Sequence, residues 1–380
     1  MQKLTDTFHK VFQKPSQAVA SAPGRLEILG NHTDYNEGVV LSCAVNQRTS
    51  AAVAINNTRQ VNLYDMRSNE HCNFSLDNLS NKISPRWGAY PAGVISELQK
   101  RGFFPEGFDA VINSTVPLSA GMSSSAAFET AILYALMKLN DFAIPPAEAA
   151  RIGQGVENNF MNLQSGLLDQ FSSIFGIKDA FILSDFRTIE VVETVTMTPE
   201  ASILVVNSME KHNLVDSEYN TRRAACESAA AKLAARHSSV KTLRDVSSEL
   251  LKSEKSLLSD VEYRRALHVT GECERVMQAL ESLKKNQLRE FGRLWYLSHE
   301  SSRINFENST PALDKLIEFA HTLPGALGAR LSGGGFGGIS IHLVENSHLE
   351  DYQESIRKLY FDYCGKIPET IICQPGAGAC

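Results

Sequence analysis

Residues 117–127 read PLSAGMSSSAA, and this stretch decides the fold because a glycine turn is followed by three hydroxyls and then an apolar run. That order predicts a loop that runs into the N-terminus of a helix, whose apolar part covers residues 126–139. The free N–H groups and the dipole at such a helix end attract an anion, so the stretch is a candidate phosphate loop. Taken alone, it has an ordinary serine-rich loop as its alternative.

Residues 328–338, GARLSGGGFGG, form a second candidate phosphate loop. Glycine occupies five of the positions 333–338, and Phe336 is the exception. Such a run lets the backbone approach a ligand closely or adopt positive φ. Neither loop has the residue order of a Walker A motif, and a plain connecting loop is again the alternative.

A third segment, residues 22–38, reads APGRLEILGNHTDYNEG and crowds polar groups into one turn. A cation, a carboxylate and several hydrogen-bonding side chains follow one another closely there, which suits the recognition of a polyhydroxylated ligand. A polar hairpin loop is the alternative. The polar side chains are Arg25, Asn31, His32, Asp34, Tyr35 and Asn36.

These three stretches share their residues with one enzyme family. Residues 22–41, APGRLEILGNHTDYNEGVVL, resemble the galactokinase signature, and the two loops resemble the second and third motifs of the GHMP small-molecule kinases. Further segments with the same resemblance are QSGLLDQFSSIFG (164–176), NSMEKHNLVDSEYNTRR (207–223) and FGRLWYLSHESSR (291–303). Several motifs in one order are more specific than any single motif. The resemblance implies an α+β fold whose N-terminal domain is similar to the second domain of ribosomal protein S5 and whose C-terminal domain is ferredoxin-like.

The composition fits a globular protein of two domains, which we expect at residues 1–195 and 196–380 with the active site between them. The 380 residues are 43% hydrophobic and 21% charged, and the net charge of −6 argues against nucleic acid as a partner. The sequence has neither a continuous apolar run long enough to span a membrane nor a secretory signal, so we expect a cytoplasmic protein with no membrane partner. Seven cysteines without CxxC spacing indicate reduced thiols rather than a zinc site.

Local patterns predict a mixture of strands and helices, in an order that indicates α+β rather than strict alternation. The expected strands cover residues 39–45, 51–55, 203–207 and 338–343. The expected helices cover residues 126–139, 147–163, 166–175, 217–237, 258–283, 287–302 and 346–360.

Phosphoryl transfer needs positioning, neutralisation of charge and a group near the attacking hydroxyl. By resemblance, Asp169 is the general base, or the acceptor that orients the sugar hydroxyl, and Arg25 lies beside it and keeps it ionised. A helix-capping aspartate is the structural alternative. The resemblance also implies ATP as the phosphoryl donor. The implied nucleotide-binding residues are Ser119, Ala120, Gly121, Met122, Ser123, Ser124, Ser125, Gly333, Gly334 and Gly335.

Ser125 and Glu157 are the metal ligands that the resemblance implies, and the metal is Mg²⁺. A hydroxyl together with one carboxylate suits this ion, which keeps several waters and shares phosphate oxygens. Without the resemblance, Glu157 reads as a surface glutamate of a helix.

The sugar ligands follow from the same resemblance. Asp34 can accept two hydroxyl hydrogen bonds, although an Asx turn is its alternative, and Tyr219 offers a hydroxyl and a ring face, although core packing is its alternative. Trp87 and Tyr90 resemble the family's segment near the adenine pocket, with core packing again as the alternative. The full expected set is Asn31, His32, Thr33, Asp34, Gly166 and Tyr219.

The chain departs from the family pattern at a few positions. The signature usually reads GRVNLIGEHTDYN, so Glu27 stands where asparagine is usual and Asn31 stands where glutamate is usual. The missing glutamate normally contacts the far hydroxyl of the sugar, which leaves the groups at C2 and C6 of the sugar open. Ser165 stands where galactokinases often carry cysteine, and Ser119 and Ala120 replace glycines.

Three hypotheses about function follow. The favoured one is an ATP-dependent sugar 1-kinase of the galactokinase type, acting on galactose as a monomer, with an oligomer as the open alternative. The second is a kinase for a hexose altered at C2 or C6, such as a galactosamine derivative or galacturonate. The third is a non-catalytic sugar sensor, but such sensors lack the two residues after the serine triplet, which are present here as Ala126 and Ala127. The HTDYN segment disfavours a mevalonate- or homoserine-type kinase.

Overall fold

A seven-stranded sheet forms the first part of the computed structural model, which describes residues 1–117, 121–210 and 215–380. Its strand order is β4-β3-β5-β2-β6-β7, with β1 paired to β2, and all neighbours are antiparallel except β3 and β5. The strands are β1 (Ala18–Leu29), β2 (Val39–Ile55), β3 (Gln60–Asp65), β4 (Glu70–Ser75), β5 (Phe108–Ser114), β6 (Ala180–Asp185) and β7 (Glu190–Thr196).

Strand β2 corrects one expectation, because the strands expected at residues 39–45 and 51–55 are one continuous strand. The polar residues between them stay extended, and Arg48 and Thr49 pair with β1. Because that short stretch is polar, the sequence pattern did not predict that the strand continues through it.

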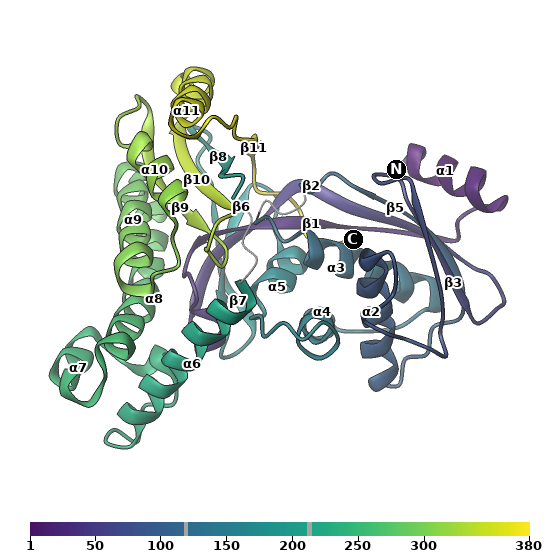
Figure 1. The fold of residues 1–380 in the computed structure, drawn as a ribbon, viewed down its shortest axis with the longest axis horizontal. Helices are drawn as coiled ribbons and strands as arrows, with labels where there is room; N and C mark the ends of the chain where they lie inside the picture. The colour runs from purple at the N-terminus through teal and green to yellow at the C-terminus, as the bar shows by residue number, and fades with distance from the viewer. Residues whose placement is uncertain (118–120, 211–214) are drawn as a thin grey trace.

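Helices cover both faces of the first sheet (Figure 1). Helix α1 (Gln2–Phe12) buries Leu4 and Phe8 against β2 and β5. The other face carries α2 (Ala89–Lys100), α3 (Ser124–Asn140), α4 (Pro146–Gly155) and α5 (Leu168–Phe175). Helix α3 lies where the apolar run predicted it, whereas the helix expected over 147–163 ends earlier and continues as a π-helical turn, Val156–Phe160.

The second part of the chain is built on a four-stranded antiparallel sheet of order β11-β8-β10-β9. Its strands are β8 (Ala201–Asn207), β9 (Ala326–Ser332), β10 (Ile339–Glu345) and β11 (Thr370–Cys373). One face packs on α8 (Asp260–Lys284) and α9 (Leu288–Ser301), and the other packs on α10 (Pro311–Ala320) and α11 (Leu349–Cys364). Every residue of β8 is buried, as expected for a central strand covered on both faces.

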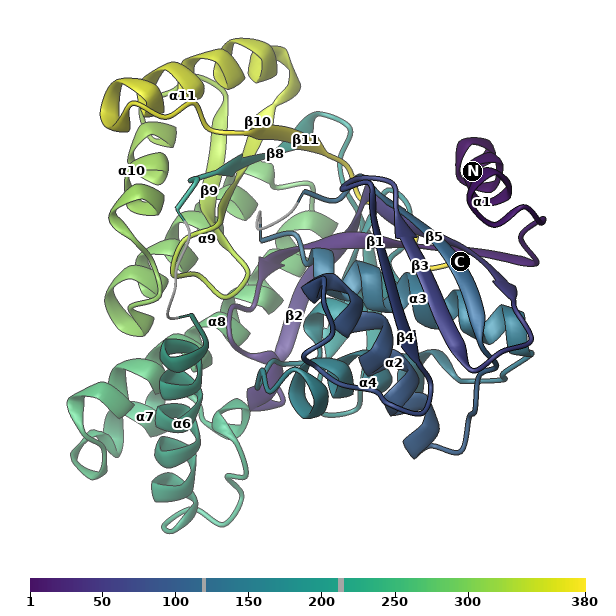
Figure 2. The ribbon, with the colours of Figure 1, turned by 45° about the vertical axis from the view of Figure 1, so that its right-hand side comes forward.

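A helical layer completes the second part, where α6 (Val215–Ala234) and α7 (Ser248–Ser253) pack on α8 around their own apolar cluster. Figure 2 shows α6 and α7 below the four-stranded sheet, with the β1–β2 end of the first sheet beside α8. The helices expected over 217–237, 258–283 and 287–302 are present with shifted ends.

The expected domain division at residues 195 and 196 falls at the end of β7 and stays a prediction. The chain does not respect it strictly, because residues 374–380 return to the first sheet: Pro375 bridges Val45, and Cys380 and Ser21 exchange two backbone hydrogen bonds of 2.9 Å. All seven cysteines are free thiols. No helix in the described ranges combines the length and the apolarity that crossing a membrane requires.

Candidate functional site

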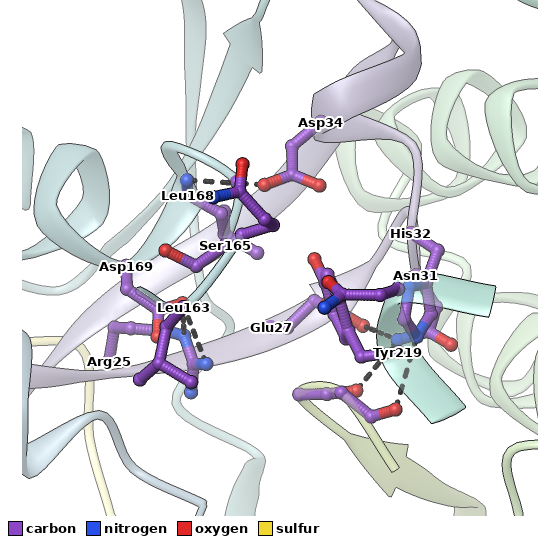
Figure 3. A pocket seen from close by; sticks show the side chains of 15 residues that line it. Arg25, Glu27, Asn31, His32, Asp34, Leu163, Ser165, Leu168, Asp169 and Tyr219 are labelled. Carbon is purple, nitrogen blue, oxygen red and sulfur yellow. Dashed lines mark hydrogen bonds and ion pairs between the residues drawn. The ribbon is translucent and has the colours of Figure 1, made fainter. Parts of the chain in front are cut away.

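A pocket of about 230 Å³ lies where the first sheet meets the second part of the chain (Figure 3). Strand β1 and the turn after it form one wall, the start of α5 and the loop before it form another, and α6 and the second glycine loop close it. The lining residues are Arg25, Glu27, Asn31, His32, Asp34, Leu163, Gln164, Ser165, Gly166, Leu168, Asp169, Tyr219, Asn220, Gly333 and Gly334.

The Asp169 carboxylate is held from two sides at one end of this pocket. Arg25 Nε and Nη2 lie 2.8 and 2.7 Å from Asp169 Oδ1, and the Ser123 hydroxyl donates to Oδ2. The Arg25 side chain is 6% exposed, whereas that of Asp169 is 28% exposed. Two donors therefore fix the carboxylate while it stays open to the pocket.

The loop that carries Ser123, Ser124 and Ser125, called the hydroxyl loop below, is anchored on β1 beside that carboxylate. Arg25 Nη1 donates to the Gly121 carbonyl at 2.6 Å, and the Arg25 N–H donates to the Met122 carbonyl at 3.1 Å. A Cβ at Gly24 would lie 2.6 Å from the Met122 oxygen, so glycine is what allows this approach. Ser123, in the left-handed region with φ 52°, ends the loop, and α3 begins at Ser124. The expected ligands Ser119 and Ala120 lie outside the described residues.

The Ser125 hydroxyl and the Glu157 carboxylate meet as the resemblance implies. Ser125 Oγ lies 3.1 Å from Glu157 Oε1, and Ser165 donates to Oε2. Burial raises the pKa of Glu157, with the charge of Asp169 adding to the effect. The π-helical turn after α4 carries Glu157, and its buried position shows that it is not the surface glutamate that its local sequence suggests. No group of three or more potential metal-binding His, Cys, Asp or Glu side chains is found in the described ranges.

Asp34 faces the pocket opposite Asp169 (Figure 3). Its Oδ2 accepts a 3.4 Å hydrogen bond from the Leu168 N–H, at the start of the helix that carries Asp169. A Cβ at Gly166 would lie 1.6 Å from that oxygen, so only glycine fits there. The ring of Tyr219 lies with its centroid 5.0 Å from that of His32 and forms the wall on the α6 side.

Two other expected sugar ligands are committed to the protein itself. His32 Nδ1 lies 2.9 Å from the Tyr35 hydroxyl and Nε2 lies 3.1 Å from the Gly334 carbonyl, so both ring nitrogens are occupied. Thr33 is fully buried, and its hydroxyl donates to the carbonyls of Gly30 and Val39 at 2.8 Å. Thr33 does not line the pocket and instead closes the turn, which corrects our expectation.

Asn31 is at the pocket wall, but its amide is also bonded within the protein. Nδ2 donates to Glu27 Oε1 at 2.9 Å and to the Gly333 carbonyl at 2.8 Å, and Oδ1 accepts from Asn308 at 2.9 Å. The sequence patterns did not single out Asn308. It lies 277 positions from Asn31, and no periodicity could have linked the two.

Buried charges from the second part hold the same turn. The backbone N–H groups of Gly30 and Asn31 donate to Glu272 Oε2 at 3.0 and 2.9 Å, and Arg330 donates to Glu27 Oε1 at 2.9 Å. Despite its burial, Glu272 has its pKa lowered by Arg275 and Arg330, so it stays ionised. Sequence analysis missed both Glu272 and Arg330.

The glycine loop at residues 333–338 lies at the pocket wall and beside Gly121 of the hydroxyl loop, since a Cβ at Gly333 would lie 3.6 Å from the Gly121 carbonyl oxygen. The Gly333 and Gly334 carbonyls accept from Asn31 and His32, which differs from the expected contact with nucleotide phosphates. Gly335, with φ +80°, packs so closely that a Cβ would lie 2.2 Å from the Asn308 carbonyl oxygen.

A second cavity, of about 620 Å³, opens on the other side of the α3 N-terminus. The rings of Trp87, Tyr90 and Phe128 line it together with Ser124 and Ser125. Trp87 and Tyr90 also pack against the core of the first part, as their alternative interpretation predicts, and their place near an adenine pocket stays a prediction.

Three family models match the chain. They are described as the galactokinase galactose-binding signature, matched by residues 6–55, the GHMP kinases N terminal domain, matched by residues 89–177, and the GHMP kinases C terminal domain, matched by residues 279–362. These matches cover all of the quoted motif segments except residues 207–223, which lie between the second and third matched ranges.

Whole-chain comparisons agree with these matches. A galactokinase of Glaesserella parasuis serovar 5 (strain SH0165) is 38% identical over 378 residues, which cover 98% of this chain and 96% of that protein. The crystal structure of Lactococcus lactis galactokinase complexed with galactose superposes with a TM-score of 0.94 at 29% identity, covering 100% of this chain and 99% of that one. The mevalonate kinase of Methanococcus jannaschii, at 16% identity and a TM-score of 0.64 over 94% of this chain and 98% of its own, shares the fold. The expected α+β fold of the GHMP kinases is therefore confirmed.

Proposed function

The chain belongs to the galactokinase family of the GHMP kinases, and we propose that its pocket binds galactose and directs the C1 hydroxyl to the γ-phosphoryl group of ATP. The observation that carries this proposal is the position of Asp169. Its carboxylate lines the 230 Å³ pocket and at the same time accepts a hydrogen bond from Ser123 in the hydroxyl loop. A hydroxyl held in the pocket would therefore meet an oriented acceptor next to the phosphate loop.

Asp169 would accept the hydrogen of the attacking hydroxyl. Arg25 keeps the carboxylate paired at 2.7–2.8 Å and, through the Gly121 carbonyl, ties it to the loop that faces the phosphates. Phosphoryl transfer depends mainly on positioning and on stabilisation of charge, and this guanidinium contributes to both.

On the sugar side, Asp34 and Tyr219 both have capacity left for a ligand. Asp34 is oriented by the Leu168 N–H and can accept hydroxyl hydrogens, while Tyr219 presents its ring and hydroxyl. Gly166 leaves room for the Asp34 carboxylate, which lies where a Cβ at this position would be. His32 would act as a positioning residue, because it braces Tyr35 and the glycine loop.

The nucleotide would occupy the second cavity and the start of α3. The rings of Trp87, Tyr90 and Phe128 suit a flat, apolar base, and Ser124 and Ser125 lie at the same cavity. The N–H groups that open α3 receive no side-chain cap from the described residues, so they can donate to phosphate oxygens. Gly121, Met122 and Ser123 would contribute backbone and hydroxyl groups along the phosphates.

Ser125 and Glu157 are the residues that would hold Mg²⁺. They fit this ion because a hydroxyl and a carboxylate oxygen, both hard donors, already converge at 3.1 Å beside the hydroxyl loop. When bound, the ion neutralises phosphate charge.

The metal assignment predicts that Glu157→Gln raises the magnesium concentration needed for half-maximal activity by roughly tenfold. The reason is that an amide oxygen replaces a charged ligand. Titration of activity against magnesium chloride measures the shift, and Glu37→Gln, which changes a surface glutamate paired with Arg187, is the control. Superimposable curves for Glu157→Gln and the wild type would contradict the assignment.

An ADP-release assay over a sugar panel tests the proposed function. With ATP and magnesium we expect the highest kcat/KM for galactose, lower values for glucose, galactosamine and galacturonate, and a phosphate on C1 by ³¹P NMR. Faster turnover of galacturonate than of galactose would favour the kinase for an altered hexose. Binding of galactose without ADP release would favour the sugar sensor.

A further inference from the structure

Glu27 presents a buried carboxylate to the sugar pocket from near the C-terminal end of β1. Its side chain is 4% exposed and belongs to the pocket wall (Figure 3). Oε1 accepts from Asn31 Nδ2 and from Arg330 Nη2, both at 2.9 Å. Oε2 has no hydrogen-bond partner among the described residues. It is not fully buried, because it is absent from the buried side-chain atoms that lack a partner. The remaining acceptor capacity of this carboxylate therefore faces the pocket.

Asn31, by contrast, has no donor left. Both Nδ2 hydrogens are used, one by Glu27 and one by the Gly333 carbonyl, and Oδ1 already accepts from Asn308. The residue is 1% exposed. A sugar could take a hydrogen from this amide only by breaking one of these bonds.

The contact between the two side chains explains the departure from the family pattern. Positions 27 and 31 carry glutamate and asparagine where the signature usually carries asparagine and glutamate. The two side chains are hydrogen-bonded to each other. The pair therefore still consists of one amide and one carboxylate, as in the usual signature, but the carboxylate comes from position 27 and the amide from position 31. The carboxylate thus enters the pocket from β1 instead of from the turn.

The place of Glu27 along β1 indicates which part of a sugar it would meet. Glu27 lies two residues after Arg25, so both side chains leave the same face of the strand, about 6.6–6.8 Å apart along it. Arg25 marks the reacting end through its pair with Asp169. A ligand bridging the two would place its reacting hydroxyl at Asp169 and a remote hydroxyl at Glu27.

We propose that Glu27 is the specificity-determining residue of the sugar pocket: its Oε2 accepts a hydrogen bond from a sugar hydroxyl remote from C1, and Asn31 is the positioning residue that holds Oε1. This inference rests on the proposed function and names its substrate class more closely. The substrate carries a neutral hydroxyl at the remote position, because a carboxylate there would face the Glu27 carboxylate. This assignment replaces our expectation that Asn31 itself binds the sugar.

The test compares wild type with Glu27→Gln on galactose and on its monodeoxy analogues at C2, C4 and C6, with kcat and KM measured separately. A hydrogen bond to a charged acceptor predicts that Glu27→Gln lowers kcat/KM for galactose by roughly 10- to 150-fold, mainly through KM. The same substitution should change kcat/KM much less for the one analogue that lacks the partner hydroxyl. Equal losses on galactose and every analogue would overturn the proposal, as would an unchanged KM.

Two further measurements keep the proposal falsifiable if Glu27→Gln folds poorly. The exchange Glu27→Asn with Asn31→Glu restores the usual order, and it should be at least tenfold more active on galactose than Asn31→Glu alone, which places two carboxylates in contact. Wild type should prefer galactose over galacturonate by at least 100-fold, and an equal or reversed preference would overturn the assignment. If wild type does not phosphorylate galactose at all, the proposed function fails and this inference falls with it, whereas wild-type activity with unaffected Glu27→Gln refutes the inference alone.

Discussion

The sugar turn, residues 30–36, and the end of the hydroxyl loop, residues 121–125, flank the same carboxylate but differ in how many of their polar side chains are bonded within the protein. In the turn, the amide of Asn31, both nitrogens of His32 and the hydroxyl of Thr33 are all bonded within the protein. In the loop, the Ser123 and Ser125 hydroxyls donate to Asp169 and Glu157, whereas the Ser124 hydroxyl has no partner among the described residues. The sugar side is therefore organised before its ligand binds, whereas the nucleotide side keeps donors available for phosphate.

Asp169 stands between these two regions, and its replacement should separate chemistry from binding. Asp169→Asn is nearly isosteric but removes the negative charge, so we expect kcat to fall about 10²–10⁴-fold. The affinities for ATP and galactose, measured by calorimetry, should stay within a few-fold because neither region is rebuilt. A kcat within a few-fold of wild type would remove Asp169 from the catalytic step.

The substitution Gly166→Ala tests whether the sugar turn is rigid. A methyl group there would lie 1.6 Å from Asp34 Oδ2, and the bonded turn offers little room to yield. Overpacking of this kind costs about 1–3 kcal/mol, which predicts a loss of about 5- to 150-fold in kcat/KM for galactose in Gly166→Ala. The dissociation constant of ATP should not change. Normal galactose kinetics would show that the turn adjusts, contrary to the comparison.

The pH dependence of galactose binding sharpens the same contrast through Glu27. Burial raises the pKa of Glu27 to about 7, although Arg330 and Arg25 oppose the shift. The ionised form is the acceptor, so the KM for galactose should fall about tenfold as the pH rises from 6 to 8. Glu27→Gln should remove that part of the profile, and an unchanged profile would contradict the assignment.

Three other groups around Glu27 do not produce this change, and the Glu27→Gln profile separates Glu27 from Asp34, whose pKa is also raised by burial. Glu272 from α8 keeps a lowered pKa, His32 has its pKa lowered to about 4 by burial, and the pKa of Tyr219 on α6 is raised well above its usual value. Over pH 6–8 these three groups keep one charge state.

The smallest effect is expected from a matched pair in the glycine loop. Gly335→Ala would place a methyl group 2.2 Å from the Asn308 carbonyl oxygen at a φ of +80°, which should cost about 1–3 kcal/mol of unfolding free energy. Gly334→Ala would meet only the Tyr219 ring at 3.7 Å, an ordinary contact, and should change stability by less than about 0.5 kcal/mol. Thermal unfolding of both variants measures the difference, and equal melting temperatures would show that the loop is not held by Asn308.

The sequence predicted well whatever depends on local pattern. The loop that opens α3 and the apolar face of that helix follow from neighbouring residues, and the structure confirms the helix. Partner choice depends instead on distant residues: Glu27 and Arg330 are 303 positions apart. Thr33 shows the same limit within a motif, because only the fold decides that its hydroxyl turns inward to Gly30 and Val39.

Residues 374–380 return to the first sheet, so the pocket gains some of its supporting contacts only after these late residues have been synthesised. Arg48 on β2 donates to the carbonyls of Ala377 at 2.6 Å and Gly378 at 2.9 Å, and the Ala379 N–H donates to the Ser173 carbonyl of α5 at 2.9 Å. Helix α5 carries Asp169 at its other end. On a ribosome the first sheet and its helices would emerge long before residues 374–380, so the helix that bears Asp169, the proposed catalytic carboxylate, would gain these backbone partners only after the residues of the second part had been made.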